Sequence, residues 1–149
     1  QVVKVSEIAQ LAIEAINPYA IQKDVQIHLV DQSKIEINAD PGDIEIIFNN
    51  LISNAVKYNK DGGKVEIILT IIDQKLNIIV KDTGIGLTQD EIDNLFEEFF
   101  RVKNEQTKHI MGSGLGLPIV KRVVDLYNGN IFIESELGKG STFTVVLPM

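Results

Sequence analysis

Two neighbouring apolar runs in the middle of the chain constrain the fold more than any other feature. Residues 64–73 read KVEIILTIID and residues 75–82 read KLNIIVKD, with Asp73 and Gln74 at the junction. Both runs are rich in β-branched side chains, and a polar pair between two such runs predicts a β-hairpin. Shorter strands are predicted over residues 25–31, 34–40, 130–136 and 141–148, the last two paired with each other across the sequence LGKG.

The first helix is predicted over residues 4–23, where apolar residues recur at helical spacing. Pro18 is expected to kink or end this helix, because proline lacks an N–H group and its ring clashes with the preceding turn. The face that we expect to be buried consists of Val5, Ile8, Leu11, Ala12 and Ile16.

Three later segments show the start and stop signals of helices. One helix is predicted from Asp40, which can cap it, to about Tyr58. A short helix is predicted over residues 88–96 and a last one within residues 114–129, with Gly129 beyond its end. Residues 97–113 have no clear period and are expected to form a long, mobile lid. Because strands and helices alternate while several strands are joined by hairpins, the sequence predicts an α/β fold. This fold is a two-layer α/β sandwich, a mixed sheet with its helices on one face.

Length, charge and cysteine content narrow the function classes. The 149 residues suit one domain over residues 1–149, although both ends look like cuts in a longer protein. The absence of cysteine excludes disulfides, thiol catalysis and cysteine-ligated metal. The net charge of −7 argues against a broad nucleic-acid surface. No apolar run approaches membrane-spanning length and no signal peptide is visible, so we expect a cytoplasmic domain without direct membrane contact, whose parent protein could still be membrane-anchored.

The second predicted helix carries a polar stripe. At about 100° per residue, Asn50, Asn54 and Lys57 fall within an arc of about 60°, beside the apolar stripe that includes Ile47 and Leu51. Amide oxygens can bind a hard cation, and a lysine can meet a phosphate as a point charge. The alternative, an ordinary amphipathic helix with poor surface residues, stays open at this point.

Two glycine-rich stretches follow. Asp82 opens DTGIGL at the end of an apolar strand, so it is expected to be partly buried. No nearby residue supplies an obvious donor, and an exocyclic amine of a ligand would satisfy this carboxylate. GSGLGL, residues 112–117, is not a dinucleotide fingerprint, because Leu117 stands where a third glycine is needed. It is a glycine-rich helix entry, whose free N–H groups suit phosphate. Together these signals predict a pocket for a magnesium nucleotide.

The motifs resemble, in order and at family spacing, the catalytic and ATP-binding domain of sensor histidine kinases, in the wider family of gyrase, mismatch-repair and heat-shock-chaperone ATPases with the Bergerat ATP-binding fold. NNLISNAVKY is similar to the N box, DTGIGL to the first glycine box, LFEEFFRV to the F box, GSGLGL to the second glycine box, and ESELGKGSTFTVVLP to the usual ending. The resemblance covers essentially the whole chain. It implies ATP contacts at Asn50, Asn54, Lys57, Tyr58, Asp82, Gly84, Gly86, Arg101, Gly112, Gly114, Leu115, Gly116 and Leu117.

The resemblance also implies individual roles. Asp82 would accept a hydrogen bond from the adenine amino group. Asn50 would hold Mg²⁺, and Asn54 and Lys57 would contact the phosphates. Arg101 would reach the γ-phosphate, so Asn50, Lys57 and Arg101 would form the catalytic group.

Further implied roles concern the base and the lid. Tyr58 would flank the adenine, and Gly86 would keep its loop close to the base. The glycines of the second glycine box would let the lid fold over the phosphates. The sequence departs from the family at Asn59 and Lys60, where Thr followed by Pro or a small residue is more common, and at Glu98, where many relatives carry a basic residue. Lys60 is expected to be solvent-exposed, and an added phosphate contact is the alternative.

The residue at position 50 favours transfer over hydrolysis. In the hydrolysing relatives a glutamate that activates water matches Asn50, and an amide cannot act as a general base. The expected acceptor is a histidine on a dimeric helical domain of the parent, which would pass the phosphoryl group to a response regulator. His28 and His109 lack the acceptor context, so this chain should not phosphorylate itself. Two alternatives stay open: a serine-kinase regulator of the same fold, and a module that binds nucleotide without transferring phosphate.

Overall fold

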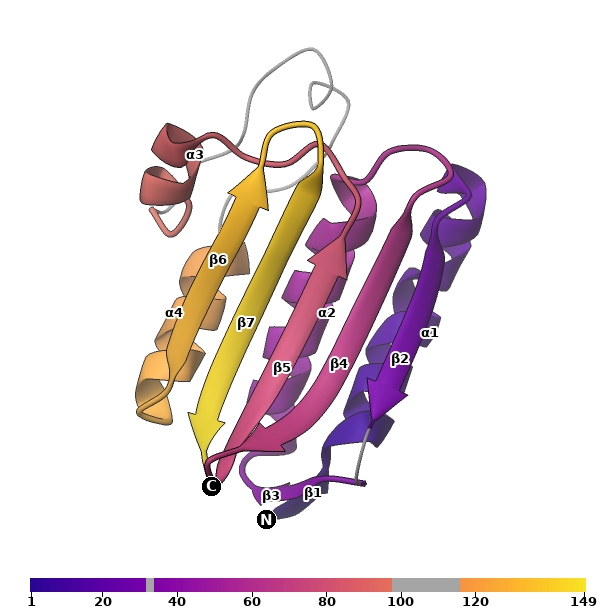
Figure 1. The fold of residues 1–149 in the computed structure, drawn as a ribbon. Helices are drawn as coiled ribbons and strands as arrows, with labels where there is room; N and C mark the ends of the chain where they lie inside the picture. The colour runs from indigo at the N-terminus through magenta and orange to yellow at the C-terminus, as the bar shows by residue number, and fades with distance from the viewer. Residues whose placement is uncertain (32–33, 98–115) are drawn as a thin grey trace.

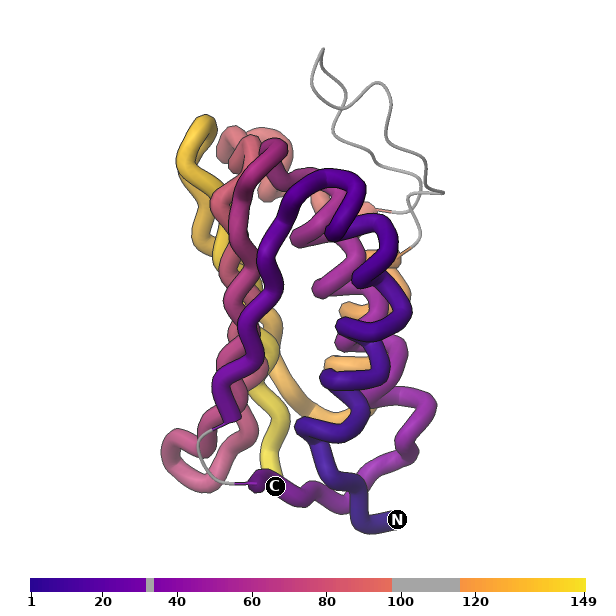
Figure 2. The backbone as a smooth tube through the Cα atoms, turned by 90° about the vertical axis from the view of Figure 1, so that its right-hand side faces the viewer, coloured from indigo at the N-terminus to yellow at the C-terminus, as the bar shows by residue number. Residues whose placement is uncertain are grey.

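The computed structural model describes residues 1–31, 34–97 and 116–149. A five-stranded sheet with the order β2-β4-β5-β7-β6 forms one layer, and helices cover one of its faces (Figures 1 and 2). The strands are β2 (Gln26–Asp31), β4 (Lys64–Ile72), β5 (Lys75–Asp82), β6 (Asn130–Glu136) and β7 (Gly140–Pro148). The helices are α1 (Val5–Lys23), α2 (Pro41–Lys57), α3 (Gln89–Asn94) and α4 (Gly116–Leu126). The predicted two-layer α/β sandwich is confirmed.

The sheet is mixed. β2 pairs with β4 in parallel, and the pairs β4–β5, β5–β7 and β6–β7 are antiparallel. The central hairpin turns at Asp73 and Gln74, whose φ angles of 52° and 61° suit the left-handed turn that matches strand twist. The predicted hairpin is therefore confirmed.

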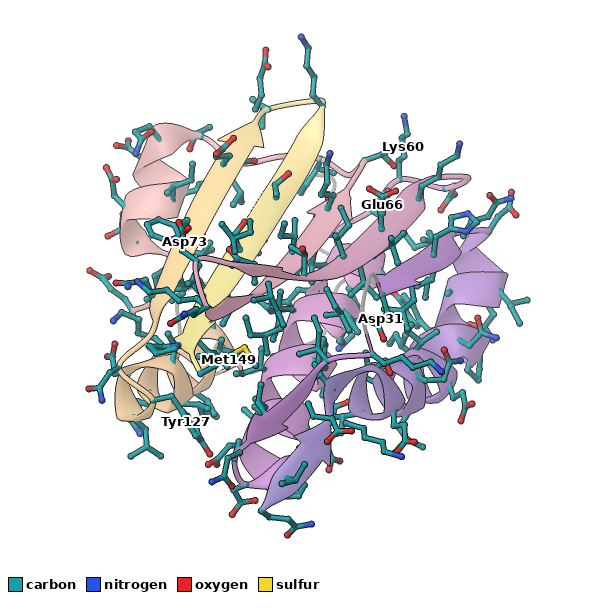
Figure 3. All side chains as sticks on the ribbon, turned by 60° about the horizontal axis from the view of Figure 1, so that its bottom comes forward. Asp31, Lys60, Glu66, Asp73, Tyr127 and Met149 are labelled. Atoms are coloured by element: carbon teal, nitrogen blue, oxygen red, sulfur yellow. The ribbon has the colours of Figure 1, made fainter. Side chains whose placement is uncertain are left out.

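The core lies between the helices and one face of the sheet. Every second residue of β4 points toward the helices, and Val65, Ile67 and Leu69 are fully buried, because side chains alternate along a strand. Helix α2 fills the space opposite them, with Phe48 at its centre. The intervening residues, such as Glu66, lie on the open face of the sheet (Figure 3). The apolar stripe of α2 is thereby fixed against the sheet, and its polar neighbours lie at the edge of the core.

Helix α1 differs from the prediction in the face that it buries. It continues past Pro18 to Lys23, which agrees with the predicted range, so the proline does not end it. Leu11 is 64% exposed and not buried, whereas Ala9 and Ala20 are buried. The buried stripe passes through Val5 and Ala9, and Leu11 lies about 120° from Val5 around the helix. Small residues on this stripe let α1 pack closely against α2.

A second correction concerns the start of the chain. Residues 2–4 form a strand, β1 (Val2–Lys4), before α1 begins. It pairs antiparallel with β3 (Glu36–Asn38), so the strand predicted over residues 34–40 is shorter and belongs to a separate two-stranded sheet.

The predicted starts of α2 and α3 are correct. The Asp40 carboxylate accepts a hydrogen bond from the Gly42 N–H at 2.8 Å and caps α2. Thr88 and Glu91 form both bonds of a capping box at α3. Helix α4 ends at Leu126, before Gly129, as predicted. The predicted lid over residues 97–113 falls almost entirely on residues 98–115, which lie outside the described part of the chain.

Within residues 1–31, 34–97 and 116–149, no helix combines the length and the apolar content that a membrane crossing requires.

Candidate functional site

The polar stripe of α2 lies at the edge of the core, as its spacing predicted. Asn50, Asn54 and Lys57 are all partly buried. The Asn50 Nδ2 donates to the Ile46 carbonyl at 2.8 Å, which fixes the amide plane. Its Oδ1 faces the start of α4, where a Cβ added to Gly116 would lie only 2.6 Å away. The described residues supply no hydrogen bond to Asn50 Oδ1 or to the side chains of Asn54 and Lys57.

The carboxyl end of α2 is tied to two other segments. The Lys23 ammonium at the end of α1 donates to the Lys57 carbonyl at 2.5 Å. Burial lowers the pKa of Lys23, and the Asp61 carboxylate opposes this effect. The carbonyl of Tyr58, the C-cap residue, accepts from the Ile85 N–H at 3.1 Å. The last helical carbonyls are thus satisfied by partners that also hold the end of the stripe in place.

Asp82 ends β5 and has two backbone donors. The Gly84 N–H donates to its Oδ1 at 2.9 Å, and the Ser141 N–H of β7 donates to the same oxygen at 3.2 Å. Our expectation that no nearby residue supplies a donor is therefore wrong, because folding brings backbone N–H groups from the following loop and the adjacent strand. Burial raises the pKa of Asp82 from 3.8 to about 6, although both hydrogen bonds lower it.

The second oxygen of this carboxylate is still available. No hydrogen bond to Asp82 Oδ2 comes from residues 1–31, 34–97 or 116–149. A carboxylate oxygen fixed in orientation by two bonds to its neighbour is a strong acceptor for an N–H donor of a ligand.

Gly84 brings the loop after β5 against the end of α2. A Cβ at this position would lie 2.3 Å from the Tyr58 carbonyl oxygen and 2.9 Å from Asp82 Oδ1. Both the Asp82 carboxylate and the end of α2 therefore require glycine at position 84. Gly86 has a φ of +71°, and a Cβ there would lie 2.1 Å from the Glu136 carbonyl oxygen, so this glycine packs against the β6–β7 turn.

The remaining predicted residues lie at the start of α4, on the surface, or outside the described part of the chain. Gly116 and Leu117 begin α4, and Leu117 is 9% exposed. Residues outside the described part of the chain are Glu98, Arg101, His109, Gly112, Gly114 and Leu115. His28 is exposed on β2, in agreement with its interpretation as a surface residue. Lys60 is exposed too, and its side chain extends away from the body of the molecule (Figure 3).

Sequence reasoning missed a link between the two helices of the site. The Tyr127 hydroxyl, just after α4, donates to Asp43 Oδ2 at 2.7 Å and accepts from the Asp40 N–H at 3.0 Å. It therefore joins the end of α4 to the start of α2. Periodicity gave no signal for this contact, because 84 positions separate Tyr127 from Asp43.

A groove of about 600 Å³ crosses the open face of the sheet. Its lining mixes cationic and anionic side chains, among them Lys64, Lys81 and Glu134. Asp82 and Thr83 at the end of β5 also line this groove, but the polar stripe of α2 does not, since α2 packs on the opposite face. We therefore assign the candidate site to the side of the sheet that faces the helices, where the loop after Asp82 contacts the end of α2.

The residues near α2 also fit a Mg²⁺ ion that is shared with phosphates. No group of three or more His, Asp or Glu side chains that could hold a metal occurs among the residues that the structure describes. Asn50 Oδ1 offers one hard oxygen ligand beside Gly116, the first residue of α4. Mg²⁺ is commonly held by one or two protein oxygens together with substrate phosphates and waters, so a single amide oxygen is compatible with this ion.

Comparison with known proteins gives a consistent result. The family described as "Histidine kinase-, DNA gyrase B-, and HSP90-like ATPase" matches residues 39–149. The sensor histidine kinase RppB of Synechocystis sp. is 43% identical over 103 residues, a match that covers 69% of this chain and 23% of that protein. The sensor histidine kinase WalK of Bacillus subtilis is 39% identical over 116 residues, which cover 76% of this chain and 19% of that protein. The chain thus spans less than a quarter of the length of either relative.

Solved structures agree with this match. The mycobacterial sensor histidine kinase MprB has a TM-score of 0.88 at 26% identity, covering 99% of this chain and 97% of that chain. Full-length ShkA in complex with AMPPNP has a TM-score of 0.85 at 30% identity, covering 99% of this chain and 30% of that chain.

Proposed function

This chain belongs to the histidine kinase-, DNA gyrase B- and HSP90-like ATPase family, and from that premise we propose that it is the nucleotide half of a sensor histidine kinase. It binds Mg-ATP as one domain over residues 1–149. It then donates the γ-phosphoryl group to a histidine on a separate helical dimerisation domain of its parent protein. Through that parent, the phosphoryl group reaches a response regulator.

The observation that carries this proposal is the pairing of Asp82 with the α2 stripe. Asp82 has one oxygen held by two backbone N–H groups and one oxygen without a partner among the described residues. Asn54 and Lys57 lie on the helix whose end contacts the loop that follows Asp82. An adenine amino group would donate to the free oxygen of Asp82, and the phosphates of the same nucleotide would meet Asn54 and Lys57.

The residues would divide the work as follows. The ionised Asp82 accepts from the adenine amino group, and Tyr58 flanks the base. Lys57 and Asn54 meet the phosphates, where charge-assisted hydrogen bonds are the strong ones. Asn50 is the protein ligand for Mg²⁺, which when bound would neutralise phosphate charge. Arg101, Gly86 and the second glycine box keep the roles that the resemblance implies.

Transfer is favoured over hydrolysis by the chemistry of Asn50. Its Nδ2 is already bonded to the Ile46 carbonyl, and neither atom of the amide can take a proton from water at neutral pH. ATP would therefore wait for the acceptor histidine, with catalysis mainly by positioning and charge neutralisation. The proposed setting is the cytoplasm, where ATP and response regulators meet.

The test is transfer between separate domains. Incubated with Mg-ATP labelled at the γ-phosphate, this chain alone should gain no label and release phosphate slowly. Addition of the parent's dimeric helical domain should produce acid-labile, base-stable label on that domain. Without a covalent link the rate should depend on concentration, because a tether normally supplies an effective concentration of about a millimolar.

The control is an acceptor domain whose histidine is replaced by glutamine, which should stay unlabelled. Label on this chain alone would contradict the half-kinase proposal. Rapid phosphate release with no labelled protein would indicate an ATPase, and acid-stable label on a partner would indicate a serine kinase of the same fold.

A further inference from the structure

The side chain of Asn59, just after the C-cap of α2, is one of the few buried polar groups described, with 4% of its surface exposed. Its Nδ2 donates to the Lys64 carbonyl at 2.9 Å, where β4 begins. Its Oδ1 accepts from the Lys60 N–H at 2.9 Å and from the Thr83 hydroxyl at 3.1 Å. One amide therefore joins the end of α2, the start of β4 and the loop that follows β5.

The direction of these bonds is well defined. The Lys64 N–H, which can only donate, bonds to Thr83 Oγ1 at 2.9 Å. The Thr83 proton is then directed to Asn59 Oδ1 at 3.1 Å in preference to the Lys64 carbonyl at 3.5 Å. Both lone pairs of Asn59 Oδ1 are used, so the amide cannot rotate by half a turn without breaking bonds.

This network lies between the two parts of the proposed nucleotide site. Asn59 directly follows Tyr58, whose carbonyl accepts from the Ile85 N–H. Thr83 directly follows Asp82, and a Cβ added to Gly84 would lie 3.0 Å from Asn59 Cα. A shift of either side chain would therefore change the spacing between the end of α2 and the Asp82 carboxylate.

We propose that Asn59 and Thr83 are positioning residues that set the selectivity for adenine, by holding the Asp82 carboxylate at a fixed distance from the end of α2. The inference rests on the proposed function, since it assumes that Asp82 reads the base. Asn59 bonds to the Lys64 carbonyl through its nitrogen and to the Thr83 hydroxyl through its oxygen, so the bridge depends on a side chain that carries both atoms.

The readout is the ratio of two affinities. IDP has the same phosphates as ADP but carries an oxygen in place of the amino group that Asp82 would bind. The ratio of ADP to IDP affinity therefore reports on the base contact alone. Thr83→Val keeps the shape of the side chain and removes its hydroxyl. We expect this variant to reduce the ratio about tenfold, which corresponds to the loss of one well-oriented hydrogen bond.

Calorimetry of the full chain should compare wild type, Thr83→Val, Thr83→Ser and Asn77→Ala with both nucleotides. Thr83→Ser retains the hydroxyl and should keep the wild-type ratio. Asn77 is the matched control, because it is also buried, at 8% exposure, but donates only to the Lys75 carbonyl at the far end of β5. Asn77→Ala should leave the ratio unchanged even where it lowers the midpoint of unfolding.

Equal loss of ADP and IDP affinity in Thr83→Val, or no loss, would overturn the proposal and leave the network purely structural. If Thr83→Val does not fold, Asn59→Ser tests the same ratio from the other partner. Failure of the wild type to bind ADP would instead contradict the proposed function, so the two failures are distinguishable.

Discussion

The two ends of the proposed nucleotide site are built differently. At the base end, the side chains of Asp82, Thr83 and Asn59 are held by hydrogen bonds with backbone groups of β4, of β7 and of the loop that follows β5. At the phosphate end, Asn54 and Lys57 have no side-chain hydrogen bond with any described residue. The base end is thus assembled by folding, whereas the phosphate end leaves its polar groups for a ligand.

The chemistry of the two halves of a nucleotide accounts for this difference. A base is neutral, so its recognition depends on a few hydrogen bonds whose geometry must be fixed beforehand. Phosphates are charged, and charge-assisted hydrogen bonds tolerate side chains that are partly solvated until the ligand arrives. Substitutions at the base end should therefore affect both stability and binding, and those at the phosphate end mainly binding.

The largest effect is expected from Gly84→Ala. The new Cβ would meet the Tyr58 carbonyl at 2.3 Å, and backbone must shift to relieve this clash. We expect a loss of about 2–3 kcal/mol in the free energy of unfolding and about hundredfold in ADP affinity, because Tyr58 or Asp82 must move. Denaturant unfolding and calorimetry measure the two quantities.

Gly116→Ala is the matched substitution at the phosphate end. Its new Cβ would meet Asn50 Oδ1 at 2.6 Å, the tip of a side chain that can move away by giving up its one hydrogen bond, to the Ile46 carbonyl. The free energy of unfolding should change by less than about 1 kcal/mol. Equal destabilisation by the two variants would contradict the contrast between the ends.

A smaller effect is expected from Asp82→Asn. The variant presents an NH₂ group or a weaker acceptor to the adenine amino group, and we expect about ten- to hundredfold loss of ADP affinity. Unchanged affinity by calorimetry would exclude Asp82 as the reader of the base.

The raised pKa of Asp82 adds a pH dependence to this comparison. Because burial raises its pKa in the folded state from 3.8 to about 6, the folded protein binds more protons at this group between these two values. Protonation of Asp82 therefore stabilises the folded state fully below about pH 4, and this stabilisation is lost as the pH rises to 6. The stability of Asp82→Asn relative to wild type should rise over this window and then level off.

Binding should follow the opposite direction. Only the ionised carboxylate offers both oxygens as acceptors, so ADP affinity of the wild type should increase as the pH rises through 6. The difference between wild type and Asp82→Asn removes the titration of the phosphates themselves. A difference that does not depend on pH would contradict the assignment.

The smallest effect on the protein itself is expected from Asn50→Ala. Alanine is the better helix former, so the free energy of unfolding should stay within about 0.5 kcal/mol of wild type. ADP affinity in the presence of Mg²⁺ should fall about tenfold, while affinity in EDTA should not change. The same loss in both conditions would mean that Asn50 acts on the nucleotide or on the helix and not on the cation.

Local chemistry determined much of the fold and part of the site in advance. The β-branched runs predicted the central hairpin, Asp40 and Thr88 predicted the helix starts, and the spacing of Asn50, Asn54 and Lys57 predicted a polar stripe beside the core. These features depend on residues within a few turns of one another, so the sequence contains all the information that they need. The burial of Leu11 was predicted wrongly, because helical spacing alone could not tell which side of α1 faces α2.

Tertiary structure decided the long-range contacts of the proposed site. The donors to Asp82 Oδ1 are backbone N–H groups, one of them 59 positions away at Ser141, and a backbone group leaves no signature in the sequence. The Asn59–Thr83 bond and the Tyr127–Asp43 bond likewise join segments that only the closed sheet and packed helices bring together. The sequence by itself therefore determined which side chains could contact a nucleotide. The fold decided which oxygens are already satisfied and which are left for the ligand, because long-range hydrogen bonds exist only after the chain has packed.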